Sequence, residues 1–369
     1  MKLYKKHISD LGKVITGKTP RTSILENYGG KIPFLTPSDN LSEKFSPTTS
    51  KTLTKIGLNE VKNCLLPSKS ICVSCIGSDL GKVVLTKKPT VTNQQFNSIV
   101  PNEENDADFI YYLMTVVGKH LNYLSKTSTA VPIINKSTFA NYEIEIPNIK
   151  EQKRIGKILS SLDDKIDLNR RINDNLEQQA QALLNEMFPH ITEGENMIGD
   201  LIMPKRGKGL LSKNAIKGDI PVVAGGIEPA TYHNQANTTA PVLTIAASGA
   251  NAGYINLWHI PVWASDSSYI DDSITPNVYF WYILLKKRQK EIFDAQVGSA
   301  QPHIYPKHIA ELPMNVVFVE KIAEYNEIVT PIFEKKGQLF LESKRLTSLR
   351  DTLLPKLMSG EVKINETNN

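Results

Sequence analysis

The sequence predicts an α+β protein in which two similar globular α/β domains are separated by two long helices that pack as an antiparallel coiled coil. Three observations predict this fold. One long helical stretch lies in the middle of the chain, a second lies near its end, and the chain repeats itself at an offset of about 170 residues. With 369 residues, the chain is long enough to give each half a sizeable core.

The central helix is expected over residues 151–188, which contain a single glycine and no proline. Alternate steps of four and three residues from Ile155 meet apolar side chains, except at Asn169 and Asn173. This heptad spacing predicts a seam that packs against a second helix. Adding 170 to each seam position gives apolar residues at seven of ten places in the C-terminal helix. The apolar seam residues are Ile155, Leu159, Leu162, Ile166, Leu176, Leu183, Val329, Ile332, Leu339, Leu346, Leu353 and Leu357.

Two features of the C-terminal copy weaken the helix pattern. Pro331 and Pro355 lack a backbone donor, and each is expected to kink or shorten this helix. The expected boundaries are 1–150 and 195–318 for the globular domains, 151–190 and 319–360 for the helices, and 361–369 for a flexible tail.

The segments before the two helices also correspond. Gly77 and Gly81 align with Gly249 and Gly253 within segments of similar sequence. Short β-branched runs broken by Gly and Pro predict irregular strands, and residues 109–114 and 279–284 each resemble one turn of a short aromatic helix. The aligned segments are 31–36 with 219–224, 74–85 with 246–257, and 127–147 with 297–317.

Charge and composition narrow the class of protein. The net charge is +5, and residues 1–150 carry 19 basic and 12 acidic side chains, whereas the central helix is acidic. Basic globular domains suit phosphate, and neutral or acidic helices suit protein partners.

No apolar run is long enough for a membrane span, and no secretory signal is expected. With three clustered cysteines, Cys64, Cys72 and Cys75, and no second pair for zinc, we expect free thiols, no metal and a cytoplasmic location.

One motif points to an enzyme. Residues 12–19, GKVITGKT, match the G-x-x-x-x-G-K-[ST] pattern of a phosphate-binding loop. That loop must follow a buried strand and open a helix, whereas Pro20 and a Gly-Gly pair favour a loop here. No G-x-S-x-G, H-E-x-x-H or Asn-Pro-Pro-aromatic pattern occurs. The sequence leaves open a nuclease site made of dispersed carboxylates, because the residues of such a site need no fixed spacing along the chain.

The chain resembles the specificity subunit of type I restriction–modification enzymes over almost its whole length. The resemblance lies in LGKVITGKTPRT and IGDLIMPKRGKG at the starts of the two domains, EQKRIGKILSSLDDKI in the central helix, and LRDTLLPKLMSGEV at the end. In that family the G-x-T-P loop belongs to a recognition domain, which accounts for the phosphate-loop pattern. The second domain has PKRGKG instead.

The resemblance implies a DNA-reading subunit with no chemistry or cofactor of its own. Each globular domain would be a target recognition domain for one half of a bipartite, asymmetric site on double-stranded DNA. The helices would set the spacing and dock two methyltransferase subunits, and restriction (translocase and nuclease) subunits would complete the assembly. A fused methyltransferase–nuclease is an alternative partner.

Loop residues are the candidates for DNA binding, because Lys and Arg contact phosphates and polar side chains read base edges. In the first domain the candidates are Lys18, Thr19, Arg21, Ser38, Asn40, Ser78, Asn93, Gln94, Gln95 and Lys126. In the second domain they are Lys205, Arg206, Lys208, Lys213, Ser248, Asn251, Asp266, Ser267 and His303. Three consecutive amides, residues 93–95, suit adenine, although one of them is expected to be structural.

Two alternatives remain at this point. Instead of reading DNA, the chain could be a nucleotide-hydrolysing P-loop enzyme built on Gly12–Thr19, or a coiled-coil scaffold that binds only protein. The first alternative requires Lys18 for activity, and the second requires no DNA retention at low salt.

Overall fold

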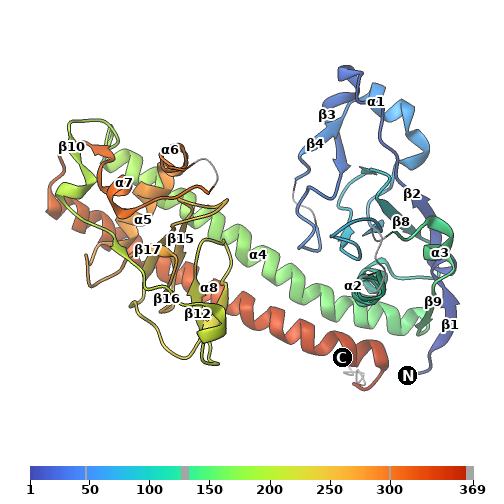
Figure 1. Cartoon of the computed structure of the whole chain (residues 1–369). Coiled ribbons are helices and arrows are strands. Elements are labelled where there is room, and N and C mark those ends of the chain that lie inside the picture. Colours follow the sequence, from blue (N-terminus) through green and yellow to red (C-terminus); the bar gives the residue numbers. More distant parts are fainter. Residues whose placement is uncertain (46–47, 126–132, 299–300, 363–369) are drawn as a thin grey trace. The chain divides into compact units, whose positions relative to one another are not determined.

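The computed structural model describes residues 1–45, 48–125, 133–298 and 301–362. The chain divides into a first unit, residues 1–167 and 344–369, and a second unit, residues 168–343. Each unit holds one globular domain and parts of two long helices, α4 (Ile149–Met187) and α8 (Val319–Ser359) (Figure 1). The predicted alternation of globular domain and long helix is confirmed.

The first domain rests on two small sheets. Its strands are β1 (Tyr4–His7), β2 (Gly12–Thr16), β3 (Tyr28–Leu35), β4 (Lys51–Leu53), β5 (Ile71–Ser74), β6 (Val83–Leu85), β7 (Val91–Thr92), β8 (Phe96–Pro101) and β9 (Glu143–Ile146), and its helices are α1 (Lys55–Glu60), α2 (Ala107–Ser125) and α3 (Lys136–Ala140). The antiparallel sheet has the order β2-β8-β5-β6, and the second sheet has the order β4-β3-β7. Strand β1 pairs with β9 immediately before α4 begins.

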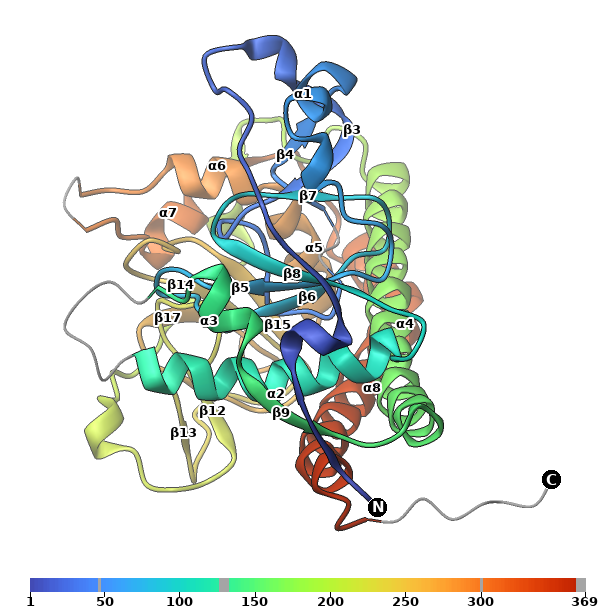
Figure 2. The same cartoon turned by 90° about the vertical axis from the view of Figure 1, so that its right-hand side faces the viewer.

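Helix α2 packs against strands β5 and β6 and closes the core of the first domain (Figure 2). Its buried side chains include Ile110, Met114, Val117 and Leu121, at steps of three and four residues. The expectation of a single aromatic turn at residues 109–114 is wrong, because this apolar spacing continues and supports a helix of 19 residues.

The second domain repeats this plan with its own strands and helices. They are β10 (Asn196–Met197), β11 (Lys205–Arg206), β12 (Ile220–Val223), β13 (Thr231–His233), β14 (Val242–Ala246), β15 (Ile255–Trp258), β16 (Trp263–Ala264), β17 (Ser267–Ile270), β18 (Pro313–Met314), α5 (Val278–Lys287), α6 (Gln289–Asp294) and α7 (Pro306–Ala310). The sheet order β11-β17-β14-β15 matches β2-β8-β5-β6, and β13-β12-β16 matches β4-β3-β7. In both domains one pair of the smaller sheet is parallel, β3 with β7 and β12 with β16.

Helices α4 and α8 pack on each other within each unit, and the pairing is antiparallel. In the first unit the early part of α4 and the late part of α8 share one core, represented by Leu159 and Leu357. In the second unit the late part of α4 and the early part of α8 share another, represented by Ala180 and Val329. Among the predicted seam residues, Ile155, Leu159, Val329, Leu339 and Leu357 are buried, and Leu162, Ile166, Leu176, Leu183, Ile332, Leu346 and Leu353 are half-buried.

The buried stripe departs from the predicted seam at its ends. Leu184 is more deeply buried than Leu183, and Leu354 is more deeply buried than Leu353. An α-helix drifts by about 20° per heptad relative to a strict seven-residue repeat, and these ends also pack on the globular domains.

Neither proline ends α8, so the expectation that Pro331 or Pro355 shortens it is wrong. Both side chains are exposed. The residues four positions earlier, Glu327 and Asp351, are exposed as well, so solvent satisfies the carbonyl groups that proline leaves unpaired.

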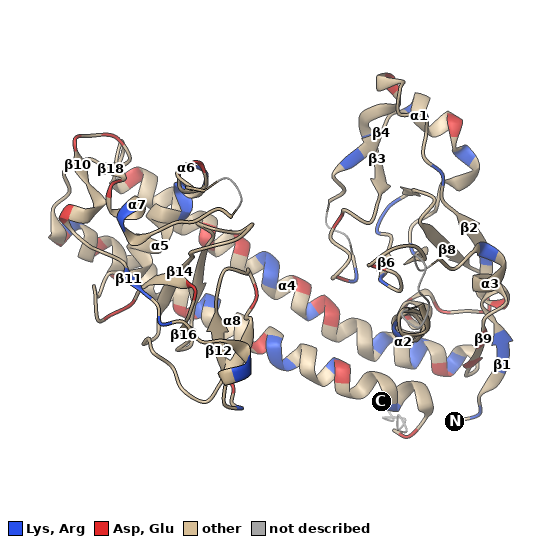
Figure 3. Cartoon of the chain, viewed as in Figure 1, with Lys and Arg blue, Asp and Glu red and all other residues tan. Residues whose placement is uncertain are grey.

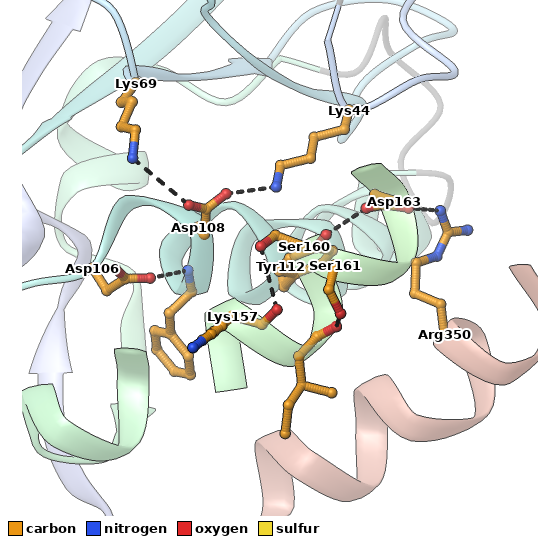
Figure 4. A network of polar contacts seen from close by, with 12 residues as sticks. Lys44, Lys69, Asp106, Asp108, Tyr112, Lys157, Ser160, Ser161, Asp163 and Arg350 are labelled. Carbon is orange, nitrogen blue, oxygen red and sulfur yellow. Dashed lines mark hydrogen bonds and ion pairs between the residues drawn. The ribbon is translucent and has the colours of Figure 1, made fainter. Parts of the chain in front are cut away.

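A buried polar network fixes the first domain to the helices (Figure 4). The Asp163 carboxylate of α4 accepts hydrogen bonds from the Tyr112 hydroxyl of α2 (2.5 Å) and from Nη1 of Arg350 on α8 (2.6 Å). Burial and the charge of Asp163 raise the pKa of Tyr112, so its hydroxyl stays a donor. Burial opposes the charge of Arg350, but its hydrogen bond and ion pair with Asp163 raise its pKa.

The second unit has a network of the same three kinds of group, a carboxylate, a tyrosine hydroxyl and a cation. The Glu177 carboxylate of α4 accepts a hydrogen bond from the Tyr282 hydroxyl of α5 (3.0 Å) and pairs with Lys336 of α8. The two tyrosines, Tyr112 and Tyr282, lie 170 residues apart. Between these networks, Nδ2 of the fully buried Asn169 donates to Glu342 (2.8 Å), so the predicted polar interruption of the seam does face the partner helix.

Candidate nucleic-acid interface

Several loops of the first domain leave the sheets at one edge. Strands β2 and β5 end there, β6 and β8 begin there, and the parallel strands β3 and β7 end beside them. We call residues 17–21, 36–40, 75–82 and 93–95 the first loop edge. Main-chain hydrogen bonds join these loops, for example from Lys18 N to Thr92 O (3.0 Å) and from Asn93 N to Leu35 O (3.1 Å).

The second domain has an equivalent edge, which we call the second loop edge, formed by residues 207–209, 224–228, 247–254 and 265–266. Six main-chain hydrogen bonds of the first edge recur in it between residues at equivalent places. The pairs of bonds are Gly17–Phe96 and Gly207–Ser267, Lys18–Thr92 and Lys208–Ala264, Asn93–Leu35 and Ser265–Val223, Cys75–Gln95 and Ala247–Asp266, Gly81–Ser74 and Gly253–Ala246, and Ile134–Cys75 and Ile304–Ala247. The repeat seen in the sequence therefore extends to individual hydrogen bonds.

The aligned glycines form the same turn in both edges. Gly77 and Gly249 have φ of 87° and 81°, and Gly81 and Gly253 have φ of 88° and 86°. Positive φ favours glycine, and a Cβ atom at position 81 would lie 2.1 Å from a main-chain oxygen of α2. The predicted alignment of these glycines is confirmed.

The candidate residues of the first domain differ in their exposure. Lys18, Arg21, Ser38, Asn40, Ser78 and Gln94 are exposed, Thr19 and Gln95 are half-buried, and Asn93 is buried. The Asn93 side chain accepts from Gln95 N (3.1 Å) and donates to Gln95 Oε1 (2.8 Å), so it holds the turn and does not face solvent. Thr19 donates to Gln94 (2.7 Å). Lys126 lies outside the described residues.

Arg21 does not offer a free guanidinium. Its Nε and Nη2 donate to Glu60 Oε1 at 3.0 and 2.8 Å, and its main-chain N–H donates to Glu60 Oε2 (3.0 Å). Hydrogen bonds from Arg21 lower the pKa of Glu60 to about 2. Sequence reasoning missed Glu60, because a partner 39 residues away leaves no local signal.

The second-domain candidates are also divided by burial. Lys205, Arg206, Lys208 and Lys213 are exposed, and Ser248, Asn251, Asp266 and His303 are half-buried. Ser267 is fully buried and its hydroxyl donates to Val223 O (3.3 Å), so we withdraw it from the contact surface. Lys205 donates to Ser273 (3.0 Å). Main-chain pairing brings Ser248 and His303 together, whereas no described bond joins Lys213 to the other candidates.

Charged residues of both signs occur on the domains and on the long helices. Lys and Arg occur on the ribbon of both domains, and both signs of charge alternate along α4 and α8 (Figure 3). Several of the basic residues are paired, including Lys44 and Lys69 with Asp108 at 2.5 and 3.9 Å. The lysines of the first loop edge are therefore distinct from those that brace its scaffold.

The phosphate-loop interpretation of residues 12–19 is wrong. Gly12–Thr16 is itself strand β2, and the following residues 17–20 are a loop that pairs with β7 and β8 instead of opening a helix. A phosphate loop needs the amide groups of a helix N-terminus, which this segment lacks.

Within the described ranges, no group of three or more His, Cys, Asp or Glu side chains is placed to hold a metal ion. Cys64, Cys72 and Cys75 are free thiols, as expected, and burial raises the pKa of Cys72 to about 12 and of Cys75 to about 11. None of the helices in the same ranges combines the length and apolarity of a membrane span.

Known proteins share this architecture and sequence. Residues 2–178 match the family described as type I restriction modification DNA specificity domain. The MjaIX specificity subunit of Methanocaldococcus jannaschii, a type I restriction enzyme subunit, is 26% identical over 98% of this chain and 94% of its own length. The chain thus carries a type I restriction–modification specificity domain and is similar along almost its whole length to a type I specificity subunit. Recognition of DNA sequence is the role that this family implies.

Two further relatives match this chain over different lengths. The HindI specificity subunit of Haemophilus influenzae is 36% identical over 49% of this chain and 40% of its own length. The crystal structure of a type I restriction-modification S subunit from M. genitalium has a TM-score of 0.59 and 22% identity, and the match covers 97% of this chain and 96% of that chain. That similarity shows the fold, including its repeated domains and long helices.

Proposed function

We propose that this specificity subunit reads a bipartite, asymmetric DNA site, with the first loop edge on one half-site and the second loop edge on the other. The observation that supports this proposal is the six-bond repeat of the two loop edges, which carry different side chains at several of the equivalent positions, such as Gln95 and Asp266. One backbone plan would place each edge against a duplex in the same way, and different side chains would select different bases.

Helices α4 and α8 act as the spacer in this proposal. Half-sites read from one side of a duplex lie about one helical turn, ~34 Å, apart. The 39 residues of α4 correspond to about 58 Å of helix. The Tyr112 and Tyr282 networks attach the two domains to these helices through buried polar contacts, which favours a fixed spacing.

The proposed subunit is non-catalytic and works in a complex. Two methyltransferase subunits dock partly on the helices, and restriction subunits supply cleavage. The repeat of the chain supports two docking positions, because each unit presents a similar combination of domain and helix. The proposed recognition domains are residues 1–150 and 195–318. The proposed location of the protein is the cytoplasm.

Selection of DNA by the full chain tests the proposal. The chain is purified alone and with the methyltransferase encoded by its host, and each preparation selects from a library of random duplexes. We expect two short conserved blocks that flank a fixed unread gap, and an affinity that falls steeply with added salt. A preparation with methyltransferase that selects no sequence would refute DNA reading, and a single uninterrupted block would refute the bipartite site.

Two variants separate the domains from the spacer. Replacement of residues 1–150 by the corresponding domain of another specificity subunit should change one block only. Insertion of one heptad after residue 167 and one after residue 343 keeps the seam in phase. Because seven residues add about 10 Å, the unread gap should grow by about three base pairs. An unchanged gap would refute the spacer role.

A matched pair of lysine variants tests the loop edge. Lys18→Gln removes an exposed cation of the first loop edge, and Lys62→Gln removes an exposed cation outside it. We expect Lys18→Gln alone to weaken binding of all sequences and to lower the salt slope by about one. Equal effects of both substitutions would remove Lys18 from the interface.

A further inference from the structure

The two loop edges carry different side chains at several equivalent backbone positions, and an arginine at the end of β11, next to the second loop edge, is held by a carboxylate of that edge. The equivalent hydrogen bonds align Gly17 with Gly207 and Gln95 with Asp266, so Thr16 and Arg206, the residues before the two glycines, are equivalent as well. The paired bridges Ile76–Ile133 and Ser248–His303 align Ile76 with Ser248. At these three positions the first edge has a hydroxyl, an amide and an alkyl group, whereas the second has a cation, an anion and a hydroxyl.

The contacts of Arg206 hold its side chain in place but do not engage all of its N–H donors. Its Nη2 donates to Asp266 Oδ1 (2.6 Å), and Asp266 Oδ2 accepts from the Ser248 hydroxyl. Both carboxylate oxygens are engaged, so Asp266 has a fixed orientation. Among the described residues, the Arg206 guanidinium makes no other hydrogen bond that the structure records, and 40% of its side chain is exposed.

An arginine of this kind matches the major-groove edge of guanine. The guanidinium has five N–H donors in a planar fork, and two parallel donors match the O6 and N7 acceptors of guanine. A carboxylate that holds the side chain in place lowers the entropy lost on binding. A lone surface lysine would be held less firmly and would suit a phosphate, which carries no sequence information.

We propose that Arg206, positioned by Asp266 and Ser248, reads a guanine in the half-site of the second domain. This inference rests on the proposed function, because it assigns one base contact within it. Thr16 and Gln95 occupy the equivalent positions of the first domain and include no cation, so the contact belongs to one half-site only.

The test uses the random-duplex selection on the full chain with its methyltransferase. Arg206→Gln should remove a guanine preference at one position of one block and leave the other block unchanged. The expected loss is about 10- to 100-fold in affinity for the site with guanine, and little for sites without it. Arg206→Lys keeps the charge but not the fork, so it should lose the same preference.

Two further variants sharpen the test. Asp266→Asn should weaken the guanine preference only partly, because it loosens Arg206 without removing it. Lys217→Gln removes an exposed cation of the same domain that is not among the DNA-binding candidates, and it should leave every base preference intact. The thermal midpoints of the arginine and lysine variants are expected to match wild type, because Arg206 and Lys217 are exposed.

Three results decide the outcome. Loss of one guanine preference in both arginine variants supports the assignment. Retention of the wild-type motif by Arg206→Gln, or equal weakening of all sequences, overturns it and makes Arg206 a phosphate contact or a bystander. A wild-type complex that selects no motif overturns the proposed function itself.

Discussion

Removal of Arg350 should strongly destabilise the first unit, because Arg350 is one of two donors to a buried carboxylate. The Asp163 carboxylate is only 8% exposed and has two donors, Arg350 at 2.6 Å and Tyr112 at 2.5 Å. In Arg350→Leu the carboxylate stays buried and keeps one neutral donor. Loss of one partner from a buried pair costs about 3–5 kcal/mol, and 27% exposure of Arg350 moves our expectation to about 2–3 kcal/mol.

The double substitution Asp163→Leu with Arg350→Leu is the informative comparison. Removal of both charges takes away the desolvation penalty together with the attraction, so it should cost less than Arg350→Leu alone. Hydrogen–deuterium exchange in increasing urea, followed on peptides from residues 150–167 and 344–359, reports the stability of this part directly. Lys5→Leu, in the exposed ion pair with Glu143, serves as the control and should cause no measurable change.

The reasoning would be refuted by either of two results. One is an Arg350→Leu variant that is as stable as wild type, which would mean that Asp163 is solvated in the protein. The other is a double variant that loses the sum of the two single effects, which would show that the charges act independently.

Three other predictions concern packing and protonation. Burial and the charge of the neighbouring lysine of α8 lower the pKa of His259 to about 4, so stability should fall by up to about 3 kcal/mol as pH drops from 6.5 to 4, and His259→Gln should flatten that part of the pH–stability curve. Gly77→Ala meets no atom within 4 Å and should cost about 1 kcal/mol, whereas Gly81→Ala meets main chain and should cost roughly 3 kcal/mol or more in thermal unfolding; equal costs would contradict the close approach. Leu184→Ala should cost about 2–5 kcal/mol by urea unfolding and Leu183→Ala less, and the reverse order would restore the strict heptad seam.

Features with a local or periodic signal could be predicted from the sequence. The heptad spacing located both long helices, and it also placed Asn169 inside the seam. The glycines at positions 77 and 81 aligned the two halves, and the structure shows that they form a turn with positive φ angles that few other residues adopt. The repeat strengthened both predictions, because the heptad spacing and the glycine pair each occur in both halves of the chain.

Features set by distant partners could not be predicted. Ser267 looks like an available hydroxyl in the sequence, and only the pairing of its strand shows that it is buried. The partners of Arg21 and Arg206 lie 39 and 60 residues away, so no spacing rule connects them. Positions 16 and 95 became comparable with 206 and 266 only once main-chain bonds aligned the two domains, whereas the sequence repeat already aligned position 76 with 248.

The bonds that hold the loop edges together run between main-chain atoms, and this has a consequence for changing specificity. A substitution at position 95 or 266 leaves the donor and acceptor of its loop in place, because every residue except proline supplies the same N–H and C=O. The side chains proposed to read DNA are thus separable from the main-chain framework that carries them. Under the proposed function, single replacements would change base preferences in one half-site at a time on an unaltered backbone.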